Sequence, residues 1–143
     1  MASDSHRTAE LLAKARGYLS SPRCAVLSSV DPDGAPHQAV VHYLLARDHL
    51  LVNGRSDRAW SSNLRRDPRV SLVVHDVDQP LHWVGLKGIA ELSAEGQAAA
   101  DDAVAMARRY GEDPAGYRAQ ERVSFRIVPG RVFEYGTSAS PNP

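Results

Sequence analysis

Residues 24–45 read CAVLSSVDPDGAPHQAVVHYLL and contain two β-like runs separated by a turn signal. The first run, Cys24 to Val30, is short and apolar and is followed by Asp31-Pro32-Asp33-Gly34. Proline at the second position and glycine at the fourth are typical of a type I β-turn. The second run, Pro36 to Leu45, returns from that turn, so this segment predicts a β-hairpin.

The segments after the hairpin predict further short strands. Arg47-Asp48-His49 is a tight connection into Leu50-Leu51-Val52, so the hairpin and this third strand are expected to form a meander. Later strands are expected at residues 69–75 and 81–92, and at 123–128 and 131–135 as a hairpin around Pro129-Gly130. In the 81–92 strand, Gly85 and Gly88 indicate a bulge or a close backbone approach.

Two amphipathic or capped segments predict helices in the first half of the chain. Apolar residues recur at spacings of three and four over residues 7–19, which predicts one helix that Pro22 ends. A short helix is expected to begin with Ser56 or Asp57 as its cap and to end near Arg66.

A third helix, rich in alanine, is expected over residues 94–110 with Ser93 as its cap. Together these segments amount to about seven short antiparallel strands and two or three helices. Closing such strands into a barrel removes their exposed edges. The sequence therefore predicts a mainly β, α+β domain built on a small barrel.

The composition limits the class of protein. A chain of 143 residues with 43% hydrophobic and 24% charged residues is ordinary for one soluble domain. Lys+Arg and Asp+Glu cancel at 17 each, so no overall field attracts nucleic acid or an acidic membrane. The single cysteine, Cys24, excludes an internal disulfide and favours a reducing, cytoplasmic compartment. Residues 1–7 lack the apolar core of a signal peptide, and no apolar run is long enough for a membrane span.

Motifs for metal binding or nucleophilic catalysis are missing from the sequence. No two histidines have the i, i+3 or i, i+4 spacing of a helical metal site, and one cysteine cannot form a thiolate cluster, so no metal is expected. No nucleophile elbow or phosphate-binding P-loop sequence is present, so hydrolase and nucleotidase functions gain no support.

Residues 53–64, NGRSDRAWSSNL, join a strand end to a helix start. The guanidinium groups of Arg55 and Arg58 beside a helix N-terminus are what a phosphate group needs. The alternative is that both arginines are solvated loop residues. Trp60 could be a core or interface residue, and Trp83 could either stack on a planar ring or belong to ordinary barrel packing.

The order of these motifs resembles the split-barrel flavin and deazaflavin oxidoreductases, which include the pyridoxamine 5′-phosphate oxidases. The resemblance implies an antiparallel split β-barrel with Greek-key character over residues 8–135, with flexible termini at 1–7 and 136–143. Its most distinctive piece is Asn63-Leu64-Arg65-Arg66-Asp67-Pro68-Arg69-Val70. The other matching pieces are residues 24–30, 33–37, 84–92 and 127–132.

The resemblance also implies a cytoplasmic homodimer with cofactor grooves between its subunits, and neither nucleic acid nor membrane as a partner. The second strand would line the isoalloxazine-type ring with Val40, Val41 and His42. The ribityl-phosphate part would be held by the end of the third strand and the loop after it, at Asn53, Arg55, Arg58, Ala59 and Trp60. Trp83 of the partner subunit would contribute to the same cofactor groove. The catalytic residue stays unknown.

Two departures from the family pattern narrow the choice of ligand. Many relatives have a lysine at the position of Trp60, where it pairs with the cofactor phosphate. A neutral indole forfeits this charge-assisted contact, worth about 1.5–3 kcal/mol, unless Arg55 or Arg58 replaces it. Ala39 stands where the pyridoxamine oxidases carry a cofactor-binding arginine, and their C-terminal substrate motif is missing. Phosphorylated B6 vitamers are therefore not expected as substrates.

The pattern is closer to the actinobacterial branch that uses the deazaflavin coenzyme F-420. The leading interpretation is an oxidoreductase that binds F-420 and passes a hydride to an unsaturated organic small-molecule acceptor, with the ring supplying the chemistry. His42 is the only titratable side chain expected beside the ring. One alternative is an FMN-dependent oxidase. The other is a non-catalytic flavin-, haem- or tetrapyrrole-binding protein in which Trp60 and Trp83 form an apolar clamp.

Overall fold

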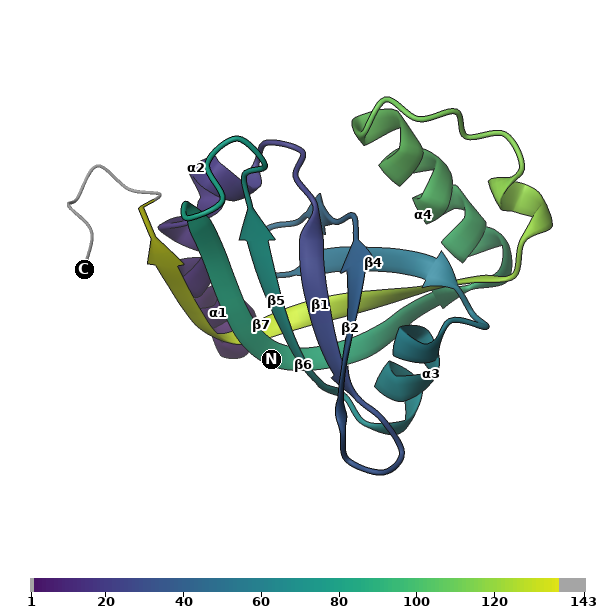
Figure 1. The fold of residues 1–143 in the computed structure, drawn as a ribbon, viewed down its shortest axis with the longest axis horizontal. Coiled ribbons are helices and arrows are strands. Elements are labelled where there is room, and N and C mark those ends of the chain that lie inside the picture. Colours follow the sequence, from purple (N-terminus) through teal and green to yellow (C-terminus); the bar gives the residue numbers. More distant parts are fainter. Residues whose placement is uncertain (1, 137–143) are drawn as a thin grey trace.

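The structure, a computed structural model, describes residues 2–136, with side chains from Ser5 onward (Figure 1). Its helices are α1 (Ala2–Ala13), α2 (Arg16–Leu19), α3 (Ala59–Arg66), α4 (Gly96–Arg109) and the 3-10 helix η1 (Tyr117–Ala119). Its strands are β1 (Ala25–Val30), β2 (Pro36–Val41), β3 (Leu44–Leu45), β4 (Leu50–Arg55), β5 (Arg69–His75), β6 (Trp83–Glu95) and β7 (Arg122–Tyr135).

The strands form one antiparallel sheet in the order β2-β1-β5-β6-β7-β4-β3. The long strands β6 and β7 pair along most of their length and connect its two halves, while α3 lies beside the hairpin of β1 and β2, and α4 lies beside the end of β4 (Figure 1). Fully buried side chains from all parts of the sheet form its core, among them Leu27, Val52, Leu72, Leu86 and Phe125. The mainly β split-barrel class with α+β character is confirmed.

The hairpin of β1 and β2 is confirmed, together with its turn. The amide of Gly34 donates to the carbonyl of Asp31 at 2.8 Å, and Gly34 has a φ of 88°, which favours glycine. The meander is confirmed only in part: Leu44 and Leu45, at the end of the predicted second strand, form β3 and pair with β4 across the tight connection, but β2 itself does not pair with β4, whose other neighbour is β7. The reason lies at Tyr43, which is fully buried and donates its hydroxyl hydrogen to the carbonyl of Leu19 at 2.8 Å. This anchor ends β2 at Val41 and turns the chain toward α2.

The expected C-terminal hairpin is also wrong, because β7 runs through Pro129-Gly130 without turning. Lys87 pairs with Arg131 while Gly88 pairs with Pro129, so Gly130 is the extra residue of a β-bulge. A Cβ atom on Gly88 would lie 2.1 Å from the carbonyl oxygen of Val128, which confirms the close backbone approach expected there. The Pro-Gly pair therefore marks a bulge in a continuous strand.

The helix boundaries differ from the sequence expectations at their starts. Residues 2–7, expected to lie outside the domain, form the first half of α1. The single helix expected over residues 7–19 is divided in two, because α1 ends at Ala13 and α2 begins at Arg16. The helix α3 ends at Arg66 as expected, but neither Ser56 nor Asp57 caps it: the Ser56 hydroxyl donates to Glu121 and the Asp57 carboxylate accepts from Arg55.

The predicted cap of α4 is wrong as well, because Ser93 lies within β6 and Glu95 occupies the cap position, where its carboxylate accepts from Arg65 and makes no hydrogen bond to the helix. Residues 137–143, expected to belong to a flexible terminus, lie outside the described residues. Among residues 2–136, no helix combines the length and apolar character that crossing a membrane requires.

Candidate functional site

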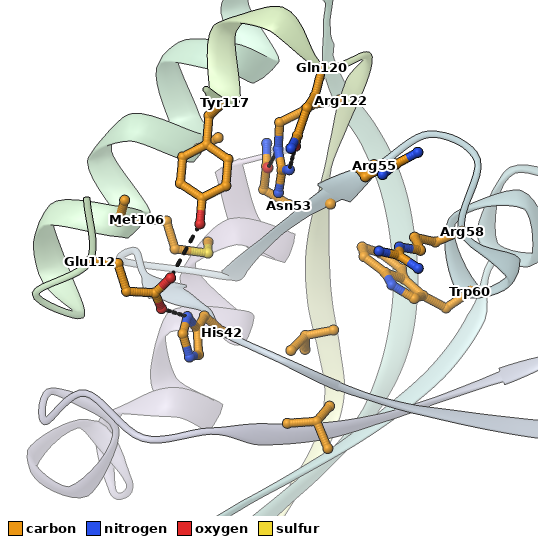
Figure 2. Close-up of a pocket in the computed structure, with 15 residues that line it drawn as sticks. His42, Asn53, Arg55, Arg58, Trp60, Met106, Glu112, Tyr117, Gln120 and Arg122 are labelled. Carbon is orange, nitrogen blue, oxygen red and sulfur yellow. Dashed lines mark hydrogen bonds and ion pairs between the residues drawn. The ribbon is translucent and has the colours of Figure 1, made fainter. Parts of the chain in front are cut away.

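A cavity of about 390 Å³ lies between the end of β2, the strand β4, the start of α3 and the helix α4 (Figure 2). Its volume is within the usual range for small-molecule sites. Seven of the nine residues predicted to hold a cofactor line it: Val40, Val41, His42, Asn53, Arg55, Arg58 and Trp60. The structure thus brings together segments that lie apart in the sequence.

The other two predicted residues, Ala59 and Trp83, do not line this cavity. The indole of Trp83 packs edge-on against Phe133 and stacks on Tyr135, with ring centroids 5.8 Å and 6.2 Å away. Within one chain, Trp60 and Trp83 therefore form no clamp around the cavity. A contribution of Trp83 from the partner subunit stays a prediction.

One end of the cavity is cationic. Arg55 forms a two-pronged ion pair with Asp57, with its Nη2 2.6 Å from Oδ2, and this pairing lowers the pKa of the Asp57 carboxyl. Arg58, at the cap position of α3, has no hydrogen-bond or ion-pair partner for its guanidinium within residues 2–136. The third cation, Arg122, lies directly opposite Arg55 in the register of the neighbouring strands β4 and β7.

Arg122 is partly buried and is held on two sides. Its Nε donates to Oδ1 of Asn53 at 2.7 Å, and its guanidinium lies 4.7 Å from the centre of the Tyr117 ring. Burial lowers the pKa of Arg122, and the positive charges of Arg55 and Arg58 lower it further. A bound anion would relieve this repulsion, so the cluster favours a negatively charged ligand group.

Asn53 has a structural role that the sequence does not indicate. Its side chain is buried, and its Nδ2 donates to the carbonyl of Ala99 at 2.8 Å and to the Ser124 hydroxyl at 2.9 Å. Ser124 in turn donates to Asp102 at 2.7 Å. Because Arg122 also donates to its Oδ1, the Asn53 side-chain amide connects β4 to both α4 and β7. Both hydrogens on Nδ2 are used in these contacts, so neither is left for a ligand.

Trp60 packs in the core, which was one of its two expected roles, and it also borders the cavity. Its side chain is 6% exposed, and its ring lies edge-on to Phe125 at 6.2 Å. A Cβ atom on Gly54 would lie 2.4 Å from the indole, so glycine at this position makes room for the ring. The indole is part of the barrel core and at the same time a wall of the site.

The wall of the cavity formed by His42, Glu112 and Tyr117 carries a chain of polar groups, visible in Figure 2. Glu112 contacts Nδ1 of His42 through Oε1 at 3.2 Å and accepts from the Tyr117 hydroxyl through Oε2 at 3.2 Å. Burial and the Glu112 charge raise the pKa of Tyr117. The His42 imidazole stacks on Tyr110 at 3.7 Å with 3° between the ring planes.

The end of α4 places Glu112 against His42. The amide of Glu112 donates to the carbonyl of Ala107, and the amide of Gly111 donates to that of Arg108. Gly111 has a φ of 70°, so this is a Schellman motif that turns the chain back at the end of the helix.

The lining residues that sequence reasoning missed come from the helix α4, the segment after it and the strands β4 and β7. They are Gly54, Ala103, Met106, Ala107, Glu112, Tyr117, Gln120 and Arg122. The repeat of alanines at 99, 103 and 107 was a usable signal, because small residues at i, i+4 spacing mark one helix face. Within residues 2–136, no three His, Cys, Asp or Glu side chains are grouped as metal ligands.

The fold and the cavity together place the chain in the class of small antiparallel split-barrel domains. The sequence model of the family described as pyridoxamine 5′-phosphate oxidase matches residues 11–136. The chain belongs to this family.

Solved structures of the same fold carry different descriptions. An F420 reductase is 20% identical with a TM-score of 0.71, over 82% of this chain and 94% of that one. A conserved hypothetical protein from Mycobacterium tuberculosis is 28% identical with a TM-score of 0.69, over 85% and 82%. The haem storage protein HutZ from Vibrio cholerae is 19% identical with a TM-score of 0.71, over 90% and 96%.

Proposed function

We propose that the cavity binds the deazaflavin coenzyme F-420, or FMN, and that the protein transfers a hydride to an unsaturated organic acceptor. The observation that carries this proposal is the cationic end of the cavity, which Arg55, Arg58 and Arg122 line and where Arg58 has no hydrogen-bond or ion-pair partner within the described chain. A phosphate is the group that such a cluster accommodates best.

The residues present fit a phosphorylated ring cofactor. The first turn of α3 has no side-chain cap, so its amides can donate to an anion beside Arg58. These cations take over the task of the lysine that Trp60 replaces. On the ring side, Val40 is 70% exposed and offers apolar surface next to His42. A bound deazaflavin or flavin would supply hydride chemistry, while the chain supplies position and electrostatics.

The proposal includes a homodimer in the cytoplasm, in which the partner subunit's Trp83 completes the groove. The large exposed fraction of Val40, at the edge strand β2 and beside the cavity, favours such a covering surface. An obligate interface of this kind should bury more than about 2,000 Å² in total. Light scattering at micromolar concentration should give the mass of two chains, and a monomer would contradict the dimer.

Replacing both Arg55 and Arg58 with alanine should weaken F-420 binding at least tenfold, about 1.4 kcal/mol. The melting temperature should change little, because Arg55 pairs only with exposed Asp57 and Arg58 pairs with nothing within residues 2–136. The matched control is Arg7→Ala/Arg126→Ala, which removes the same charge from exposed positions outside the cavity. Equal affinity of both double variants would mean that Arg55 and Arg58 are merely solvated.

Haem binding is the second candidate function, and one observation favours it. A histidine that ligates a metal commonly donates its second ring nitrogen to a carboxylate, and the Nδ1 of His42 contacts Glu112 in this way. The fold shared with a haem storage protein is compatible with this alternative. Haemin titrated into the protein should then produce a sharp Soret band that His42→Gln abolishes.

A further inference from the structure

Beside the arginines, the cavity has a second polar group of side chains, which reaches Arg122 through the ring of Tyr117. It consists of His42, Glu112 and Tyr117, joined through the two oxygens of one carboxylate. The side chain of His42 is 31% exposed and that of Glu112 is 43% exposed, and all three residues line the cavity. These groups can exchange protons with solvent and with a ligand.

The imidazole is held in one orientation from two directions. Tyr110 covers one ring face, and its own hydroxyl is fixed by donating to the carbonyl of Arg23 at 2.6 Å. Glu112 contacts Nδ1, and the Schellman motif at Gly111 fixes the backbone of Glu112. A carboxylate on Nδ1 keeps a proton there, which leaves Nε2 as the nitrogen that exchanges a proton.

We propose that His42 is the proton donor of the reaction at this site, that Glu112 is its positioning residue, and that the acceptor is a conjugated carbonyl compound. This proposal rests on the proposed function, because it needs a reduced deazaflavin or flavin as the source of the hydride. The two ends of the cavity then have separate tasks: the arginines bind the anionic part of the cofactor, and the His42 wall serves the acceptor.

The step balances in atoms and charge. The β-carbon of the acceptor gains a hydride and forms a C–H bond, and the π electrons shift toward the carbonyl oxygen. That oxygen takes the proton from Nε2 of protonated His42, so an N–H bond breaks and an O–H bond forms. The acceptor gains two electrons, which the reduced cofactor loses, and the resulting enol becomes the saturated ketone. The neutral imidazole keeps the proton on its Nδ1, which faces the Glu112 carboxylate, and its Nε2 regains a proton from solvent.

The test uses F-420 in its reduced form as hydride donor and 2-cyclohexen-1-one as acceptor. His42→Gln should still bind F-420, because the arginines that hold its anionic part are unchanged, but should turn over about 100-fold more slowly or worse.

His37→Gln is the matched control, because His37 lies on the same strand but outside the cavity, and it should keep the full rate. A readout that needs no turnover is the nitrogen-15 spectrum of His42, in which Glu112→Ala should abolish the preference for a proton on Nδ1.

The outcomes separate this proposal from the proposed function. No F-420 binding by the unaltered protein would overturn both. Binding of F-420 with a rate of ketone reduction that His42→Gln leaves unchanged would overturn the proton donor alone, as would binding without any reduction of the ketone. An unchanged nitrogen-15 spectrum in Glu112→Ala would overturn the positioning role of Glu112.

Discussion

Replacing Trp60 with lysine should lower the free energy of unfolding by about 2–4 kcal/mol, through lost aromatic burial and the burial of a charge. The indole is 6% exposed and lies against Gly54 and Phe125, so the ammonium group of a lysine would have to displace packed side chains to reach the cavity. We therefore expect no gain in F-420 affinity, although lysine is the usual residue in relatives. Chemical denaturation and an F-420 titration measure the two effects.

Two controls separate packing from charge in this experiment. Trp60→Phe keeps an aromatic ring and should lose less than half as much stability. Val77→Lys places the same cation at a side chain that is 76% exposed and should change stability by no more than about 0.5 kcal/mol. A stable Trp60→Lys protein that binds F-420 more tightly would show that the indole only obstructs the phosphate side of the site.

Replacing Asn53 with leucine should destabilise the fold by about 2–4 kcal/mol and weaken F-420 binding more than tenfold. Leucine keeps the size of the side chain but removes the hydrogen bonds to Ala99, Ser124 and Arg122. The partly buried Nε of Arg122 then has no acceptor, so this cation is no longer held at the cavity. Thermal unfolding and a cofactor titration on one variant test both parts.

Gln38→Leu is the matched control, because it removes an exposed amide from β2 and should leave both quantities nearly unchanged. If Asn53 acted only as a ligand to the cofactor, its replacement would weaken binding and leave the free energy of unfolding as it is. That result would contradict the structural role of Asn53.

The sequence predicted the elements whose signals are local. The strand at 69–75 and the turn at Gly34 are in the structure as expected. The motif from Asn63 to Val70 has a structural role at its first residue: the buried Asn63 amide donates to Ser29 at 3.0 Å and to Asp31 at 2.9 Å, which ties α3 to the first hairpin.

The features that the sequence did not predict depend on contacts between distant parts of the chain. Pro129-Gly130 carries the same local signal whether it turns a hairpin or forms a bulge, and only the pairing of β7 with Gly88 decides between them. Likewise, Glu112 and Arg122 reach the cavity through the end of α4 and the register of β7 against β4. Nothing near either residue in the sequence marks it as part of a site with His42.

The most direct test of the account is a titration of the purified protein with coenzyme F-420, FMN and haemin, with the Arg55→Ala/Arg58→Ala variant beside it. We expect saturable binding of F-420 or FMN, one molecule per chain, at micromolar concentration, weakened at least tenfold in the double variant (about 1.4 kcal/mol). Binding of haemin alone, or of neither F-420 nor FMN, would contradict the proposal that this cationic cavity holds a phosphorylated flavin-type cofactor.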